Sequence, residues 1–133
     1  MEYVEKFRDL TVYKSSKKLS KDIFELTKKF PKEEMYSLTD QIRRCSRSIG
    51  GQIAEAWGKR RYEKHFVSKL TDADGEQLET QHWVETALDC CYISEETAKA
   101  LTLECIYIGN MLNSMINKSS TFCNIRTLKV DNQ

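Results

Sequence analysis

Residues 30–61 read FPKEEMYSLTDQIRRCSRSIGGQIAEAWGKRR, and their apolar side chains recur every three or four positions. That spacing is typical of an α-helix that buries one face. The apolar face consists of Met35, Leu38, Ile42, Cys45, Ile49, Ile53 and Ala56. Pro31 disfavours helical backbone at Phe30 and suits the start of a new helix. We therefore predict an amphipathic helix over residues 33–57, with this face in the core.

Two further groups of side chains lie outside that apolar face. Arg43, Arg44 and Arg47 form a basic patch. Small residues form a strip made of Gly50, Gly51, Ala54 and Gly58. A glycine inside a helix costs roughly 1 kcal/mol relative to alanine, which is tolerable where it allows close packing or a bend. Because another backbone could approach this strip closely, Gly50, Gly51 and Ala54 are candidates for an oligomer interface.

The remainder of the chain predicts three more helices. The 133 residues are 40% hydrophobic and include one Pro and five Gly, which fits one helix-rich globular domain. Apolar residues at helical spacing predict helices over 11–29, 61–91 and 94–118. Four long helices with short connections predict an all-α fold, an antiparallel up-down-up-down four-helix bundle over residues 1–118. Residues 119–133 are predicted to be a polar tail, either disordered or docked on the bundle.

The helix predicted over 61–91 has an apolar face whose first and last members are Tyr62 and Cys91. Polar residues interrupt this face. Gln77, Thr80 and Gln81 stand in the middle of this face. Polar groups buried there must hydrogen-bond to one another or to water. We expect such contacts to fix the register of the helices more than they add stability.

The helix over 94–118 is apolar on more than one face. Its core face consists of Ala98, Leu101, Cys105, Ile108, Leu112 and Met115. A second apolar set consists of Leu103, Ile106, Tyr107 and Met111. A helix that is apolar over so much of its circumference is buried on more than one side. Since 133 residues leave little to cover it, we expect a homo-oligomer in which Leu103, Tyr107 and Met111 contact a neighbouring subunit.

The net charge of +1 hides an uneven distribution along the chain. Residues 1–64 hold 16 Lys and Arg against 10 Asp and Glu, a net charge of +6, whereas residues 65–133 hold 5 against 10, a net charge of −5. An anionic partner such as RNA or DNA would suit the basic part, and contact between oppositely charged subunits would suit both parts. Ordinary solvated helix faces are a third explanation.

Basic residues in the first half are the candidates for phosphate binding, which is independent of sequence and depends on salt. They are Lys14, Lys17, Lys18, Lys21, Arg43, Arg44, Arg47, Lys59, Arg60, Arg61 and Lys64. Alternatively, Arg43 and Arg47 pair with acidic residues of the helix over 61–91, in the same subunit or in a neighbour. We favour a structural role for Arg44 and a nucleic-acid role for residues 59–61, because Glu55 and Glu63 are too few to neutralise that corner.

Pairs of titratable residues give little support for catalysis or for a metal site. Glu55 and Glu79 lack an accompanying base or nucleophile, which acid–base chemistry would require. His65 and His82 are too far apart along a helix to ligate one metal ion and are more typical of surface or interface positions. We therefore predict no enzyme activity, no cofactor and no metal.

The cysteines and tryptophans are more typical of packing than of chemistry. No CxxC spacing joins any of the five cysteines, and the adjacent Cys90 and Cys91 are weak support for redox chemistry. Trp57 and Trp83 could stack on nucleic-acid bases, but core or interface anchors are the more usual role.

The segments that would direct the chain to a membrane or out of the cell are not recognisable. No apolar run approaches the roughly 20 residues that a membrane span requires. The first ten residues, MEYVEKFRDL, are too charged for a signal peptide. We expect a cytoplasmic protein without a membrane partner.

Several of these motifs resemble one bacterial family of four-helix-bundle proteins. Its members are also called large-subunit rRNA intervening-sequence proteins and are often labelled ribosomal proteins. The resemblance rests on FRDL at 7–10, LTKKFPKEEMYSLTDQIRRCSRSI at 26–49, IAE at 53–55 and Gly58, and continues at Phe66, Leu70, Ala73, Gly75, Glu79, Ala87 and residues 92–96. The chain departs from the family at Gly50 and Gln52, where proline and asparagine are usual.

The resemblance implies an antiparallel four-helix bundle without enzyme activity. Some members assemble as pentameric rings, so it implies a homopentamer. The genes were noticed inside insertions in rRNA genes, which is a genomic location and not membership of the ribosome. A similar bundle is the basic, nucleic-acid-binding accessory subunit of reverse transcriptases in diversity-generating retroelements. The resemblance thus favours a ring-forming, nucleic-acid-associated accessory protein, and a self-assembling protein-interaction scaffold is the alternative.

Overall fold

The computed structural model of the chain describes residues 4–124. Its long helices are α1 (Thr11–Thr27), α2 (Leu38–Gly58), α3 (Glu63–Asp89) and α4 (Glu95–Asn117). Its short elements are η1 (Phe7–Asp9), η2 (Lys32–Glu34) and α5 (Ser119–Phe122). No strand occurs between residues 4 and 124. The predicted all-α helical bundle is confirmed.

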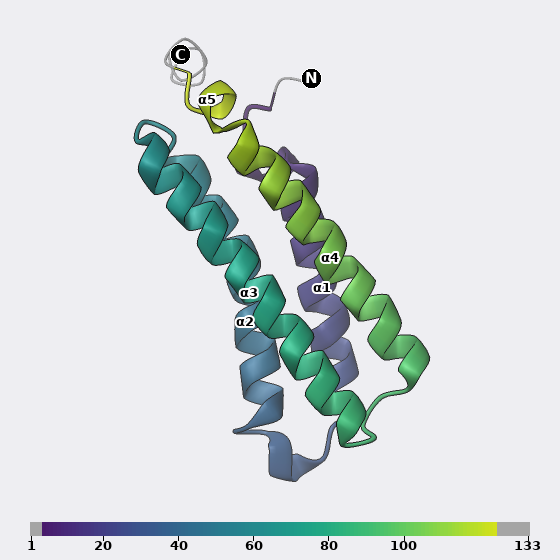
Figure 1. Ribbon diagram of the computed structural model, residues 1–133. Helices are drawn as coiled ribbons and strands as arrows, with labels where there is room; N and C mark the ends of the chain where they lie inside the picture. Colours follow the sequence, from purple (N-terminus) through teal and green to yellow (C-terminus); the bar gives the residue numbers. More distant parts are fainter. Residues whose placement is uncertain (1–3, 125–133) are drawn as a thin grey trace.

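Successive long helices run in opposite directions along the molecule (Figure 1). α2 packs on α1 and α3, while α4 packs on α3 and closes the bundle against α1. α3 and α4 form the near face in Figure 1, and α1 and α2 lie behind them. The bundle therefore has one seam between α1 and α2 and another between α3 and α4.

The apolar faces predicted from the sequence form the core. The side chains that lose practically all exposure include Leu19, Ile23, Ile42, Ile49, Ile53, Phe66, Leu70, Ile108 and Leu112. Burying one such side chain contributes about 1.5–3 kcal/mol. All four long helices supply members of this group, so the core is continuous through the bundle.

The second helix begins later than the predicted residue 33. Its predicted first turn is the separate 3₁₀ turn η2, and Ser37 then leaves helical geometry with φ −127° and ψ −106°. The Leu38 N–H donates to Glu34 Oε1 at 3.3 Å, which satisfies one of the free N–H groups at the start of α2. The prediction that Met35 lies in the core is wrong, because this break leaves it 51% exposed.

The ends of the third helix also differ from the prediction. Cys91 adopts a left-handed φ of 61°, and the N–H groups of Cys91 and Tyr92 donate to the carbonyl oxygens of Leu88 and Ala87 at 2.9 Å each. This is the Schellman arrangement that ends helices, usually at a glycine. Because α3 spans only Glu63–Asp89, Tyr62 and Cys91 are exposed and not part of the predicted packed face.

Polar residues in the middle of α3 are buried and hydrogen-bonded, as predicted. Gln81 Nε2 donates to Gln77 Oε1 at 2.8 Å, and Gln77 Nε2 donates to Asp74 Oδ1 at 2.9 Å. Thr80 Oγ1 donates to the Glu76 carbonyl at 2.8 Å. Gly109 of α4 lies against this layer, since a Cβ atom there would stand 2.7 Å from Gln77 Nε2.

The start of the predicted tail packs on the bundle. The Phe122 ring of α5 stacks on Phe66 with centroids 5.8 Å apart and meets Trp57 edge-on at 6.5 Å. The packed unit therefore extends past the expected boundary at residue 118. Residues 125–133 of the predicted tail lie outside the described part of the chain.

Candidate functional site

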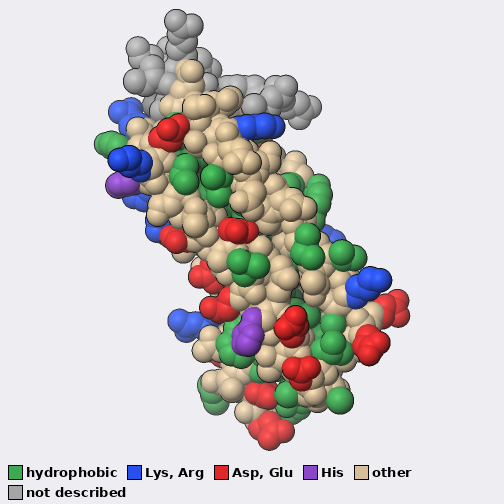
Figure 2. Space-filling view, in the orientation of Figure 1, with side chains coloured by type: hydrophobic (Ala, Val, Ile, Leu, Met, Phe, Trp, Pro, Cys, Tyr) green, Lys and Arg blue, Asp and Glu red, His purple; other side chains and the backbone are tan. Residues whose placement is uncertain are grey.

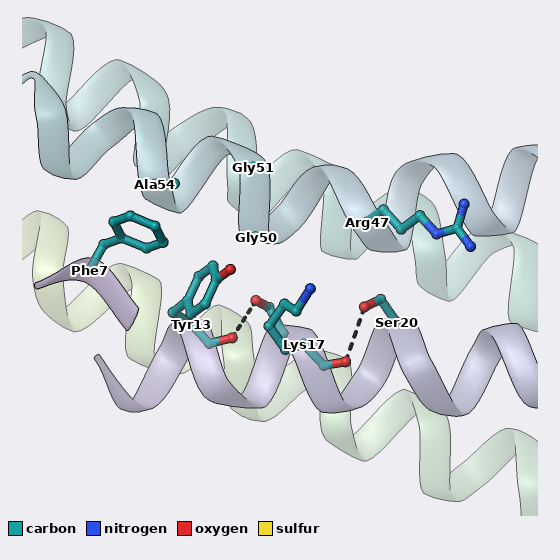
Figure 3. A pocket seen from close by; sticks show the side chains of 9 residues that line it. Phe7, Tyr13, Lys17, Ser20, Arg47, Gly50, Gly51 and Ala54 are labelled. Carbon is teal, nitrogen blue, oxygen red and sulfur yellow. Dashed lines mark hydrogen bonds between the residues drawn. The ribbon is translucent and has the colours of Figure 1, made fainter. Parts of the chain in front are cut away.

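A groove lined by basic and aromatic side chains follows the seam between α1 and α2. Near the start of α1 it holds a cavity of about 170 Å³ (Figure 3), which adjoins an open trough of about 490 Å³. A third hollow of about 240 Å³ lies near the end of α1. We call this the basic groove; its basic residues are Lys17, Lys18, Lys21, Lys28, Lys32, Arg43 and Arg47. No Asp or Glu of the described residues lines these three hollows.

Gly50 sets the distance between the two helices that form the groove. It is buried inside an unbroken α2, and a Cβ atom there would stand 3.1 Å from Ser16 Oγ and 3.5 Å from the Tyr13 ring. The close approach expected at the small-residue strip is thus made by α1 of the same chain at Gly50. Gly51 and Ala54 line the groove beside it.

Three cations that line the cavity and the trough of the basic groove are exposed and lack a carboxylate partner among the described residues. Lys17, Lys21 and Arg47 form no ion pair with any residue from 4 to 124. A concave surface with unpaired charges of one sign concentrates a field that attracts the opposite charge. These three residues are therefore the part of the groove best suited to an anion.

Lys18, by contrast, is neutralised by two carboxylates. Its ammonium lies 2.7 Å from Asp22 Oδ2 and 2.7 Å from Glu104 Oε1. The hydrogen bonds to Asp22 and then to Glu104 raise the pKa of Lys18 above its usual range. Lys18 therefore links α1 to α4, and its positive charge is neutralised by these carboxylates and is not available to an anionic ligand.

Phe24 orders the arginines of the groove. The Arg43 guanidinium lies 4.8 Å from the centre of the Phe24 ring, and the Arg47 guanidinium lies 5.4 Å from it. Arg43 Nε also donates to Thr27 Oγ1 at 2.7 Å. The face of an aromatic ring attracts a cation, so Phe24 holds both side chains along the seam without neutralising them. This arrangement keeps their charge available to a ligand.

The alternative in which the arginines pair with α3 of the same subunit is not seen among the described residues. Neither Arg43 nor Arg44 forms an ion pair with any residue in the range 4–124. Burial, and after it the nearby charge of Glu79, raises the pKa of the Glu76 carboxyl on α3, and Ser48 of α2 partly offsets this shift. Arg44 is exposed on α2, away from the groove.

The basic residues at the corner between α2 and α3 differ in exposure, whereas the sequence suggested one basic cluster. Lys59, Arg61 and Lys64 are exposed, but Arg60 is buried with 7% of its surface accessible. Arg60 Nε donates to the Trp57 carbonyl at 2.8 Å, and its guanidinium lies 3.6 Å from the centre of the Trp57 ring. Arg60 therefore packs at the end of the bundle, and its burial against Trp57 contradicts the prediction that it contacts phosphate.

The two carboxylates considered for acid–base chemistry contact different side chains. Glu55 pairs with Lys69 at 3.0 Å, and Glu79 accepts from Trp83 Nε1 at 3.3 Å. The His82 ring packs edge-on against Trp83 at 4.7 Å. In the described part of the chain, no group of three or more His, Cys, Asp or Glu side chains is placed to hold a metal ion.

The cysteines comprise two buried thiols, two exposed thiols and the half-buried Cys123. Burial raises the pKa of Cys45 to about 11 and that of Cys105 to about 12, which keeps both protonated at neutral pH. Thr80 Oγ1, which donates to the Glu76 carbonyl, also lies 3.2 Å from Cys45 Sγ, so this thiol is part of the polar layer of α3. Cys90 and Cys91 are exposed at the end of α3.

The second apolar set of α4 lies on the surface. Leu103, Ile106 and Tyr107 are 56%, 43% and 54% exposed, and Met111 is half-buried. We call Leu103, Ile106 and Tyr107 the α4 strip. Figure 2 shows apolar and acidic side chains interspersed over the face formed by α3 and α4. Exposed apolar groups that gather on one helix are typical of a contact surface.

Sequence reasoning missed the aromatic lining of the basic groove. Phe7, Tyr13 and Phe24 lie off the core stripe of their segment, and each lines one of the hollows. Their signal in the sequence was an aromatic residue among basic residues, beside the core stripe and not in it; all three side chains are half-buried. Lys17 and Lys21, which were among the basic residues noted, are brought beside Arg47 by the packing of α1 on α2.

Comparisons with known proteins agree with the fold. A family model described as 23S rRNA-intervening sequence protein matches residues 8–114. The chain is similar to the crystal structure of a protein of unknown function from the S23 ribosomal protein family of Bacteroides thetaiotaomicron. The two share 29% sequence identity with a TM-score of 0.72, over 80% of this chain and 95% of that one. None of the curated proteins matches the chain. Within residues 4–124, no helix is both long and apolar enough to cross a membrane.

Proposed function

Because the chain belongs to the 23S rRNA-intervening sequence protein family, we propose that it is a non-enzymatic protein that associates with RNA or DNA. The observation that carries this proposal is the basic groove, where Lys17, Lys21 and Arg47 are exposed and form no ion pair within residues 4–124, beside a cavity and a trough that no described Asp or Glu lines. Phosphate is the anion that nucleic acids present at regular spacing, and lysine and arginine neutralise it without reading the sequence.

The groove supports binding along a strand more than binding of one small anion. Its basic residues follow the seam from Lys17, past Arg47, to Lys32 at the other end of α1. Successive phosphates could meet successive cations along such a path. The acidic residues gather on α3 and on the face that Figure 2 shows, so a polyanion would be held to one side of the molecule.

The first test of this proposal is a salt titration with the wild-type protein. We expect affinity for RNA and DNA of unrelated sequences to be similar and to fall steeply with salt. If three phosphates are neutralised, log K plotted against log salt should have a slope of about −2.7 for duplex DNA and about −2.1 for single strands. Fluorescence anisotropy at several salt concentrations measures this slope. No binding to either nucleic acid at low salt would contradict the proposal.

A second function, self-assembly, has support of its own in the α4 strip. Leu103, Ile106 and Tyr107 are large apolar side chains that a monomer would leave in water. We propose that they contact a second copy of this chain in a homo-oligomer, with the pentamer of similar bundles as the expected form. Several copies would also bring several basic grooves together, and linked weak sites gain avidity without new contacts.

Replacing the α4 strip with polar residues is expected to lower the mass of the particle. The triple variant Leu103→Gln, Ile106→Gln, Tyr107→Gln removes apolar area while keeping good helix formers in α4. Light scattering on the wild type should report an oligomer at micromolar concentration, and the variant should shift toward the monomer. A matched control replaces three other exposed apolar residues, Met35, Tyr36 and Tyr62, with Gln and should keep its mass. A monomeric wild type would contradict this proposal.

A further inference from the structure

The cavity at the start of the basic groove has features that phosphate binding alone does not use. Figure 3 shows the rings of Phe7 and Tyr13 at one end, residues 50–54 of α2 as a wall, and Lys17 and Arg47 toward the other end. The two rings meet edge-on with centroids 5.0 Å apart. Its chemistry is therefore aromatic at one end and cationic at the other.

The size of the cavity fits one planar ring. It measures about 170 Å³, and a protein cavity of about 150 Å³ is large enough to take up benzene. A Cβ atom at Gly51 would meet no atom within 4 Å beyond its own helix, so the wall formed by α2 is open at that point. A flat group could thus enter from the trough and lie along the bare backbone of α2.

We propose that this cavity receives one unpaired base of a single-stranded nucleic acid. The base would lie against the Tyr13 and Phe7 rings, and the phosphates on either side of it would meet Lys17 and Arg47. A cationic groove combined with aromatic side chains is how proteins hold single strands without reading sequence. The proposal rests on the function proposed above and narrows it, because the bases of a duplex are paired and cannot enter.

The test compares three probes of equal charge. They are an oligouridylate of roughly ten nucleotides, within the site sizes of single-strand-binding domains, the same backbone without bases, and a duplex with the same number of phosphates. With the wild type, we expect the oligouridylate to bind about tenfold more tightly than the base-free strand, since stacking of one base is worth about that factor. Equal affinity for these two probes would overturn the inference.

A variant that fills the cavity tests most directly whether the cavity receives a base. Gly51→Leu adds a side chain where the α2 wall is open, and we expect it to abolish the tenfold preference for the base-bearing strand. The matched control is Gly75→Leu on α3, where a Cβ atom also meets nothing within 4 Å, and it should behave as the wild type. A Gly51→Leu variant that keeps the preference, or that weakens all three probes equally, would overturn the inference.

The probes also separate the two proposals. If no probe binds at low salt, the phosphate-binding function itself is wrong. If the base-free strand and the duplex bind with a steep salt dependence but the oligouridylate gains nothing, the groove binds phosphate and only the base site is wrong. Light scattering on Gly51→Leu completes the test, because a fall in mass would assign the cavity to subunit contact and not to a base.

Discussion

The triple variant Lys17→Glu, Lys21→Glu, Arg47→Glu is expected to bind RNA and DNA more weakly than the wild type by a factor of at least about one hundred. An exposed charge pair at contact distance is worth about 1 kcal/mol in water. Three lost contacts therefore remove about 3 kcal/mol, and each 1.4 kcal/mol is a factor of ten in affinity. The new carboxylates would also repel phosphate, so the loss should exceed this value. Anisotropy in about 0.1 M salt measures it.

The control for this variant is a second triple reversal of equal charge. Lys59→Glu, Arg61→Glu, Lys64→Glu changes the exposed corner between α2 and α3 and leaves the basic groove intact. We expect it to lower affinity less than the groove variant does and to leave the circular dichroism spectrum unchanged. If the corner variant loses more affinity than the groove variant, phosphate binding belongs to the corner that the sequence favoured, and the groove assignment is wrong.

The fold was predictable because the apolar residues of each long helix recur at helical spacing. Ile42, Ile49 and Ile53 are buried as that spacing requires, and the polar Gln77 and Thr80 are hydrogen-bonded as their burial requires. The errors lie at helix ends, where capping hydrogen bonds decide the boundary. In the structure, Met35 lies outside α2 and Cys91 lies outside α3. Neither boundary could be derived from periodicity alone.

The candidate site was predictable only in part. The sequence indicated which residues are basic, but a face of one helix does not reveal which neighbouring helix will cover it. The groove exists because Gly50 lets α1 approach α2, which places Lys17 beside Arg47. For the same reason, the burial of Arg60 was not predictable from the sequence. Its contact with Trp57 depends on how the chain turns after α2.

The variant Phe66→Ala is expected to lower the free energy of unfolding by about 3–5 kcal/mol. The Phe66 side chain is fully buried in the core, and its ring stacks on Phe122, which also meets Trp57. Alanine would leave a cavity beneath both rings, and the surrounding helices cannot close it completely. Small domains are stable by about 5–15 kcal/mol, so this is a large share of the total. Urea unfolding followed by circular dichroism measures the change.

Tyr62→Ala is the matched aromatic control for Phe66→Ala. Tyr62 directly precedes α3 and is 63% exposed, so its loss should change the free energy of unfolding by no more than about 0.5 kcal/mol. The difference between the two variants reports how tightly α5 and the start of α3 pack at this end of the bundle. Similar effects from both substitutions would mean that Phe122 does not seal the core there, and the packed unit would then end with α4.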